Sequence, residues 1–325
     1  MIQTPAIDRQ KAALFARLDV LSQQKPELAE PLAFYRATLP LLNEAQAQVE
    51  PVELPAEVAR QKLAAGLPLL LGEDLPLAPE ATRDLFIRLC GIVETVGLPQ
   101  QAAPPQKKTW PFFFGPKRRP DPAQLLEQAH AGNETALRTA AAQQIRQAVE
   151  QRQLDLLAVW SALATGDGQL VDGQSHDLKL DANLVRTLAQ NSLKPALRAW
   201  AADLKEKVDL AIWRRGSCPV CGSPPTLAEI QGKEGARHLR CGMCGADWGY
   251  PRLKCATCTN QNHKSLGYIT VEGEEEKYSI QTCQVCHNYL KVIVTFEPTP
   301  VDMLAIEDLA TLHLDLIANE RGYSH

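Results

Sequence analysis

Cys218-Pro219-Val220-Cys221-Gly222 begins a stretch in which eight of the nine cysteines form four Cys-x-x-Cys pairs. Two intervening residues let both thiolates of a tight turn reach one metal ion, and two such turns complete a tetrahedral shell of four sulfurs. Four pairs therefore predict two metal sites. The pairs are Cys218/Cys221, Cys241/Cys244, Cys255/Cys258 and Cys283/Cys286, separated by 19, 10 and 24 residues.

The order of these pairs reveals an internal repeat between residues 213 and 296. Each unit has a knuckle, a hairpin, a second knuckle and a closing strand, which is the order found in zinc ribbons and rubredoxins. We therefore expect sequential pairing, with the first four cysteines on one ion and the last four on the other, although the interleaved pairing of cross-brace modules stays open. The predicted strands span 225–230, 236–240 and 246–253 in the first unit, and 266–271, 277–280 and 289–296 in the second.

The residues beside the knuckles support this interpretation. Gly222 and Gly245 suit the positive φ that such turns need, and we expect Asn260 and Asn288 to serve in the same way in the second unit. Four sulfurs already complete each shell. Three nearby histidines are therefore expected outside the shells: His238, His263 and His287.

Other uses of clustered cysteines fit the sequence less well. Residues 1–11 show no apolar stretch typical of a secretory signal, and no run of about 18 apolar residues suggests a membrane span. We therefore expect a reducing, cytoplasmic location, where clustered cysteines indicate metal or redox chemistry rather than disulfides. Zinc would make the sites structural and iron would allow one-electron chemistry, and the pattern leaves this choice open.

The first two hundred residues, rich in Ala, Leu and Gln, predict an all-helical domain in which Cys90 is a packed core thiol. The composition changes near residues 210–217. We therefore expect four parts: a helical domain at 1–210, two rubredoxin-like or zinc-ribbon modules at 211–254 and 255–300, and a C-terminal amphipathic helix at 301–325.

Proline punctuates the predicted helices, and the proline-rich segment 98–122 breaks the helical pattern. Within that segment, the aromatic run 110–114 followed by the basic run 117–119 is a weaker candidate for contact with a partner. The predicted helices span Asp8–Gln23, Glu27–Val49, Pro55–Ala65, Pro79–Val96, Pro122–Gln151, Gln153–Ala164, Ala182–Lys207 and Val301–Glu320.

Charge argues against nucleic-acid binding. The chain has a net charge of −4, and residues 211–296 contain ten Lys and Arg against seven Asp and Glu. Two tetrathiolate sites with divalent ions would bring the module to about −1, without a sustained basic stripe. The helical part shows no recognisable catalytic constellation.

The cysteine region resembles the family of the formate dehydrogenase accessory protein FdhE. The resemblance covers about residues 210–325, and the helical part agrees only in general character. It rests on the four knuckles in their order and on four further stretches: Cys244-Gly245-Ala246-Asp247-Trp248, Arg252 before Cys255-Ala256-Thr257-Cys258, Cys283 to Lys291, and the tail segments 308–316 and 320–323.

This resemblance implies a cytoplasmic maturation factor rather than an enzyme, which contacts the catalytic subunit of respiratory formate dehydrogenase before its export. It also implies two mononuclear tetrathiolate ions per chain on the eight paired cysteines, with iron favoured over zinc. Two alternatives belong to other classes. A rubredoxin-like electron carrier would need iron at an exposed site, and a zinc-ribbon nucleic-acid factor would need salt-sensitive binding.

Overall fold

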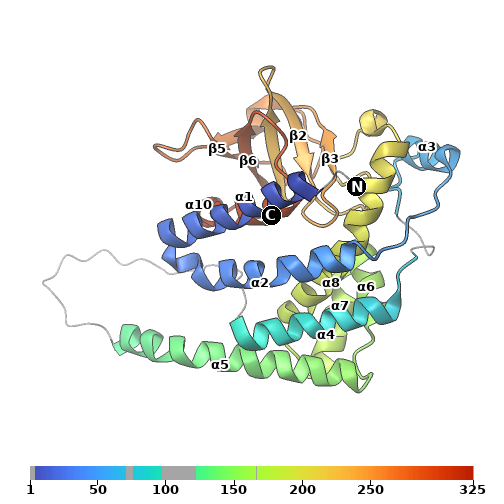
Figure 1. Ribbon diagram of the computed structural model, residues 1–325. Helices are drawn as coiled ribbons and strands as arrows, with labels where there is room; N and C mark the ends of the chain where they lie inside the picture. The colour runs from blue at the N-terminus through green and yellow to red at the C-terminus, as the bar shows by residue number, and fades with distance from the viewer. Residues whose placement is uncertain (1–3, 71–75, 97–121, 166, 325) are drawn as a thin grey trace, which may run out of the picture.

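A computed structural model describes residues 4–70, 76–96, 122–165 and 167–324 of the chain. The helices form a body beneath a single twisted sheet (Figure 1). The described residues form ten α-helices: α1 (Thr4–Gln24), α2 (Ala29–Gln46), α3 (Ala56–Ala64), α4 (Pro79–Val96), α5 (Pro122–Glu150), α6 (Leu156–Thr165), α7 (Gly168–Asp177), α8 (Ala182–Lys207), α9 (Val301–Ala310) and α10 (Leu312–Glu320).

Both cysteine-bearing units contribute to one six-stranded sheet. Its strand order is β3-β2-β1-β6-β5-β4, and all neighbours are antiparallel except β1 and β6. That parallel pair, with Ala228 opposite Val292 and Gln231 opposite Thr295, joins the two units through their backbones. The strands are β1 (Leu227–Gln231), β2 (Ala236–Arg240), β3 (Asp247–Gly249), β4 (Leu266–Ile269), β5 (Tyr278–Cys283) and β6 (Tyr289–Thr295).

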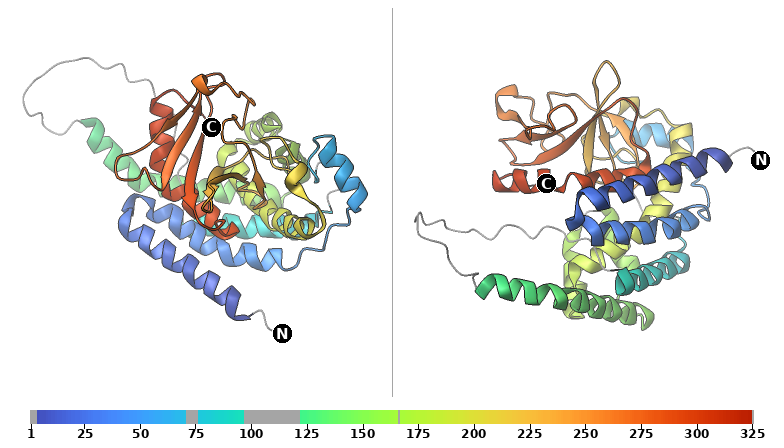
Figure 2. Two further views of the ribbon diagram at one scale, coloured as in Figure 1. Left: turned by 90° about the horizontal axis from the view of Figure 1, so that it is seen from above. Right: turned by 60° about the vertical axis from the view of Figure 1, so that its left-hand side comes forward.

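The C-terminal helices α9 and α10 lie between the sheet and helices α1 and α2 (Figures 1 and 2). Ile306 and Leu309 of α9 pack with Leu14 and Leu18 of α1, while Leu314 of α10 joins a cluster with residues of β4 and β5. The single helix predicted for Val301–Glu320 is in fact two helices that meet at Thr311. Burial on both sides explains why this amphipathic segment folds back onto the body.

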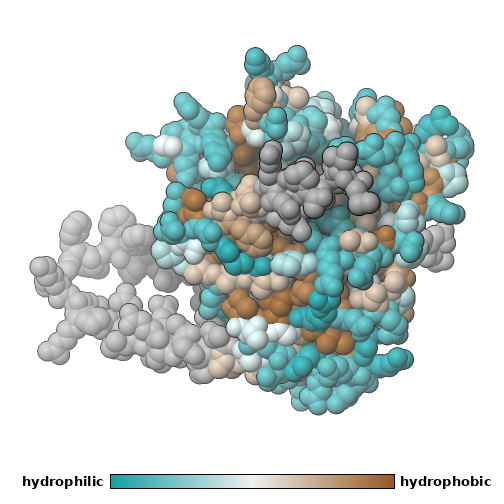
Figure 3. All heavy atoms as spheres, viewed as in Figure 1, coloured by the Kyte–Doolittle hydropathy of each residue, from teal (hydrophilic) through white to brown (hydrophobic). Residues whose placement is uncertain are grey.

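The largest hydrophobic core runs without interruption from the helical body into the first cysteine unit. It includes Leu188 and Trp200 of α8, Leu239 of β2 and Trp248 of β3. On the face shown in Figure 3, apolar residues gather over the helices below the sheet and the outer edges are hydrophilic. The first cysteine unit is thus part of the core rather than an appended module.

Most predicted helices are present with small changes at their ends. Helices α4 and α8 have the predicted limits, and Cys90 is fully buried in α4, where burial raises the pKa of its thiol to about 12. Helix α7 (Gly168–Asp177) was not predicted, because two glycines and a polar composition mask its pattern. The aromatic run 110–114 and the basic run 117–119 lie outside the described residues.

The predicted fold class is confirmed: a helical N-terminal part, a small β region with two four-cysteine clusters, and helix at the C-terminus. The domain limits at 210, 254 and 300 remain predictions, and strands from both sides of residue 254 share the sheet. Within the described ranges, no helix has the length and apolar character needed to cross a membrane.

The continuous core predicts a large cost for Leu188→Ala. Leu188 is 0% exposed in α8, so truncation should lower the free energy of unfolding by about 2–5 kcal/mol through lost burial and a residual cavity. Leu137→Ala on α5 is the control, because that side chain is 63% exposed and its truncation should change stability by less than about 0.5 kcal/mol. Chemical denaturation measures both, and equal effects would contradict the described packing.

Candidate metal centres

The structure brings the eight paired cysteines into two clusters. In each cluster the four sulfurs lie within 4.8 Å of one another. The grouping is sequential, as expected, and not interleaved. The first cluster holds Cys218, Cys221, Cys241 and Cys244, and the second holds Cys255, Cys258, Cys283 and Cys286.

The distances between sulfurs fit a metal shell and exclude disulfides. The Sγ atoms of Cys218 and Cys244 are 3.5 Å apart, and those of Cys255 and Cys286 are 3.7 Å apart. A tetrahedral ion with metal–sulfur bonds of about 2.3 Å separates its sulfurs by about 3.8 Å, whereas a disulfide bond measures about 2.05 Å. Both clusters could therefore hold a zinc or iron ion, and the donor set is the one those ions accept.

The knuckles share one backbone pattern that aims their sulfurs at the centre of each cluster. The N–H of the first cysteine donates to the carbonyl five residues later, as from Cys218 to Ser223 at 2.8 Å and from Cys255 to Asn260 at 2.8 Å. The residue after the second cysteine has positive φ, which confirms the expectation for Gly222 (82°) and Gly245 (77°).

In the second unit the expected position was wrong by one residue. Thr259 (φ 61°) and His287 (φ 54°) take the left-handed conformation, rather than Asn260 and Asn288. These residues directly follow the second cysteine, so the knuckle geometry decides the position and overrides the preference of asparagine. The Asn260 side chain instead donates from Nδ2 to the Cys283 sulfur at 3.6 Å.

The thiols of each cluster influence one another's ionisation. Burial raises the pKa of Cys218 and Cys244 well above the usual value, while hydrogen bonds from the neighbouring thiols lower the pKa of Cys221. Burial also raises the pKa of Cys283, but backbone N–H groups of Cys286 and Val285 outweigh it and bring the pKa to about 6. A bound cation would supply the positive charge that lets all four thiols of a cluster ionise together.

The two clusters differ in how they are covered. All four cysteines of the first cluster are 7% exposed or less, whereas Cys255, Cys258 and Cys286 of the second are partly exposed. The segment before residue 71 covers the first knuckle, with Leu69 N–H donating to Pro219 at 2.9 Å and Leu70 N–H donating to Val220 at 2.8 Å. This covering role was not evident from the sequence, where the segment shows only as an apolar run.

Comparisons with known proteins find similarity over the residues that carry both clusters. Residues 217–252 match the family description "FdhE, central domain", and residues 253–325 match "FdhE, C-terminal domain". Over residues 217–325, the chain is therefore similar to the FdhE family. An FdhE homolog of Aquifex aeolicus is 37% identical over 144 residues, which cover 43% of this chain and 50% of that protein. An FdhE homolog of Pseudomonas aeruginosa is 36% identical over 192 residues, or 57% of each chain.

The likeness to a solved FdhE structure extends over the helical part. The crystal structure of the FdhE protein from Pseudomonas aeruginosa matches with a TM-score of 0.59 and 24% identity, covering 96% of this chain and 91% of that one. At this identity the match shows the shared fold. In the sequence alignments, the chain spans about half the length of the curated FdhE relatives.

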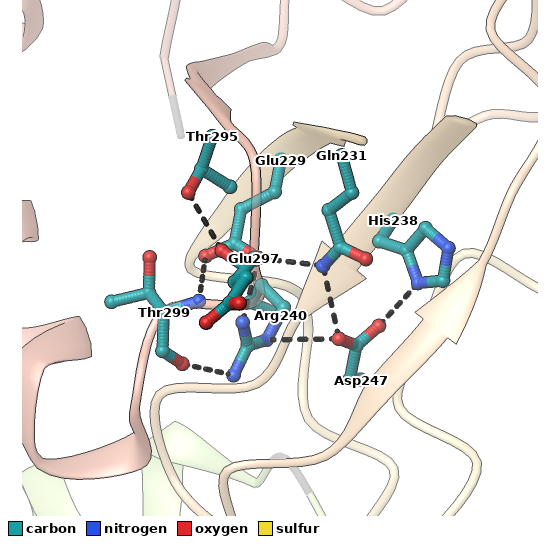
Figure 4. A network of polar contacts seen from close by, with 8 residues as sticks. All are labelled: Glu229, Gln231, His238, Arg240, Asp247, Thr295, Glu297 and Thr299. Carbon is teal, nitrogen blue, oxygen red and sulfur yellow. Dashed lines mark hydrogen bonds and ion pairs between the residues drawn. The ribbon is translucent and has the colours of Figure 1, made fainter. Parts of the chain in front are cut away.

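A buried polar network fixes the hairpin that carries the second knuckle of the first cluster (Figure 4). Arg240, directly before Cys241, donates from Nη1 to Glu229 at 2.6 Å and from Nη2 to the Thr299 carbonyl at 2.7 Å. Gln231 Nε2 donates to both Glu229 and Asp247, at 2.7 and 3.0 Å. The network therefore ties β1, β2 and β3 of the first cysteine unit to the segment leading into α9.

His238 extends this network toward the surface. Its Nδ1 lies 2.5 Å from Asp247 Oδ1, and this hydrogen bond raises the pKa of His238 above its usual value. The other two histidines, His263 and His287, are exposed. The expectation that all three stand outside the four-sulfur clusters agrees with their positions.

We expect His238→Asn to destabilise the metal-loaded chain more at pH 5.5 than at pH 8.5. A raised folded-state pKa contributes stability that is fully present below the unfolded value of about 6.5 and is lost as pH rises through the folded value. Because the ring is partly exposed, the difference should be about 0.5–1 kcal/mol. Denaturation of both proteins at the two pH values measures it. His263→Asn is the control, and a His238→Asn effect that stays constant with pH would contradict the described pair.

Proposed function

We propose that the chain is an accessory protein for the maturation of respiratory formate dehydrogenase. The match of residues 217–325 to the FdhE central and C-terminal domains, with all eight paired cysteines in two clusters, carries this proposal. In this role the chain acts in the cytoplasm and contacts the catalytic subunit before that subunit is exported.

The metal content is part of the proposal. Each cluster binds one ion through four thiolates, and iron is favoured over zinc by the family resemblance. Support comes from the 3.5–3.7 Å separations between paired sulfurs and from the hydrogen bonds of Val220 N–H to Cys218 and of Asn260 to Cys283. Such hydrogen bonds orient thiolate ligands and tune the electronic properties of the metal they bind.

We propose further that the chain catalyses no reaction of its own. Among the described residues, the two cysteine clusters are the groups of His, Cys, Asp and Glu whose ligand atoms meet closely enough to hold an ion. Each has a complete set of four protein ligands, and closed shells of this kind lack the open position of a catalytic metal. A binding and maturation role suits such sites better than hydrolysis or group transfer.

Gene deletion in the native organism tests the proposal. Loss of the chain should abolish formate-dependent dye reduction by the exported formate dehydrogenase while leaving other exported enzymes active. Plasmid-borne wild-type protein should restore the activity, and a variant with all eight paired cysteines replaced by serine should not. Full formate dehydrogenase activity in the deletion strain would refute the maturation role.

A further inference from the structure

The two clusters have unequal access to solvent, and this difference has a chemical consequence. A chelating ligand removes a metal by first making a bond to it, so it must pass between the sulfurs or wait for the site to open. In the first cluster the cysteines are 0%, 7%, 0% and 2% exposed. In the second, only Cys283 is buried, and the other three are partly open to solvent.

The first cluster is closed from two sides by other parts of the chain. Leu69 and Leu70 hydrogen-bond to the knuckle at Pro219 and Val220, and Leu69 is 1% exposed. At the other knuckle, a Cβ on Gly245 would lie 2.5 Å from Val301 at the start of α9, so that helix sits directly on the turn. A cleft of about 980 Å³ reaches Cys244 and Gly245, yet Cys244 remains 2% exposed. Opening this site means moving the packed core.

The second cluster faces outward at the far end of the sheet. Val285, inside its last knuckle, is 63% exposed, and Leu253, two residues before Cys255, is 62% exposed. A cavity of about 60 Å³ lies beside it and is lined by both Cys255 and Cys283. The cavity therefore borders two of the four cysteines of this cluster.

The cavity has a positive lining. Arg237, Arg252 and Lys254 contribute to it, together with His263, and no carboxylate does so among the described residues. Arg237 is 4% exposed, and its buried Nε has no hydrogen-bond partner. In the sequence, no Asp or Glu stands between Asp247 and Glu272. This charge favours entering ligands that are anionic, such as carboxylates or thiolates.

We propose that the second cluster is the exchangeable metal site of the chain, which passes its ion to or from an anionic ligand set through this cavity, while the first cluster is a closed site that holds the two parts of the fold together. The proposal rests on the metal content given under Proposed function. In the exchange, the ion moves from four thiolates to the entering ligands, the thiolates take up protons, and no electron is transferred.

Cobalt(II) is the probe that tests this proposal, because its thiolate complexes absorb visible light and it accepts the tetrahedral sites used by zinc. The full chain is loaded anaerobically and mixed with excess EDTA, which is anionic, or with 1,10-phenanthroline, which is neutral. We expect two phases of one equivalent each, with the fast phase at least about 100-fold faster than the slow one, as local and core opening differ in free energy.

Variants of the chain assign each phase of cobalt release to one of the two clusters. Cys258→Ser should remove the fast phase and keep the slow one. Val301→Ala, which thins the cover over Gly245, should accelerate only the slow phase. Arg252→Gln combined with Lys254→Gln should slow the fast phase by about threefold or more with EDTA, and leave it unchanged with phenanthroline.

Three results would overturn the proposal. They are release of both ions in one phase, a fast phase that survives Cys258→Ser, and a charge variant that slows both chelators equally. These results leave the maturation role intact, because two ions would still be bound. A chain that binds fewer than two cobalt ions would instead contradict the proposed metal content itself, and the exchange proposal with it.

Discussion

Replacing Cys218 and Cys221 together with serine should remove one of the two proposed ions and unfold the junction between sheet and helices. The first cluster lies in the largest hydrophobic core, and its cysteines are almost completely buried. Structural zinc sites contribute about 10–16 kcal/mol of binding free energy to the folding of small domains, so loss of even part of this should exceed the stability of the junction. Native mass spectrometry and near-ultraviolet circular dichroism measure the two effects.

The matched control replaces Cys255 and Cys258 with serine. This variant should also lose one ion, but the second cluster lies outside the largest core, so helices α4 and α8 should keep their cooperative unfolding. If the Cys218/Cys221 variant still bound two ions, the sequential grouping of the sulfurs would be wrong. If both variants lost the same amount of structure, the two clusters would contribute equally to stability despite their unequal burial, which would contradict this account.

Arg240→Met should destabilise the chain by about 3–5 kcal/mol, because it leaves the Glu229 carboxylate charged, buried and without its ion-pair partner. Glu229 and Arg240 have side chains that are 0% and 3% exposed, and their charged atoms are 2.6 Å apart. Arg240 also anchors the Thr299 carbonyl ahead of α9. Denaturant unfolding of the metal-loaded chain measures the loss.

A double variant distinguishes the stability lost with the ion pair from the cost of leaving the buried Glu229 carboxylate unpaired. Adding Glu229→Leu to Arg240→Met removes the unpaired carboxylate, so the double variant should be more stable than Arg240→Met alone. Arg60→Met is the control for removal of an exposed arginine, since its ion pair with Glu57 lies on the surface and should contribute less than about 1 kcal/mol. Equal stability of the single and double variants would contradict the described network.

The local features of the metal centres could be predicted from the sequence. Two residues between cysteines fix the turn, and glycine at 222 and 245 permits the positive φ that follows it. The hairpins could also be predicted from local sequence, because short runs of strand residues alternate with short runs of turn residues. The prediction failed only in the second unit, where the left-handed conformation falls on Thr259 and His287 instead of on the asparagines that follow them.

The features that depend on distant parts of the chain could not be predicted. Pairing of β1 with β6 joins segments about 60 residues apart, and no local pattern specifies which edges of two hairpins meet. The cover over the first cluster comes from Leu69 and Leu70, about 150 residues before the knuckle they contact. No local pattern marks Arg240 and Glu229 as buried, because their burial depends on contacts with the distant segment at Thr299.

Anaerobic affinity purification of the tagged chain from a lysate of its native organism, followed by mass spectrometry of the proteins that co-elute, tests the proposed maturation role most directly. We predict recovery of a formate dehydrogenase catalytic subunit whose export signal is uncleaved, and loss of that subunit when all eight paired cysteines are replaced by serine. Recovery of only ribosomal, transcriptional or electron-transfer proteins would contradict the role and would mark the two clusters as parts of a general binding or redox module.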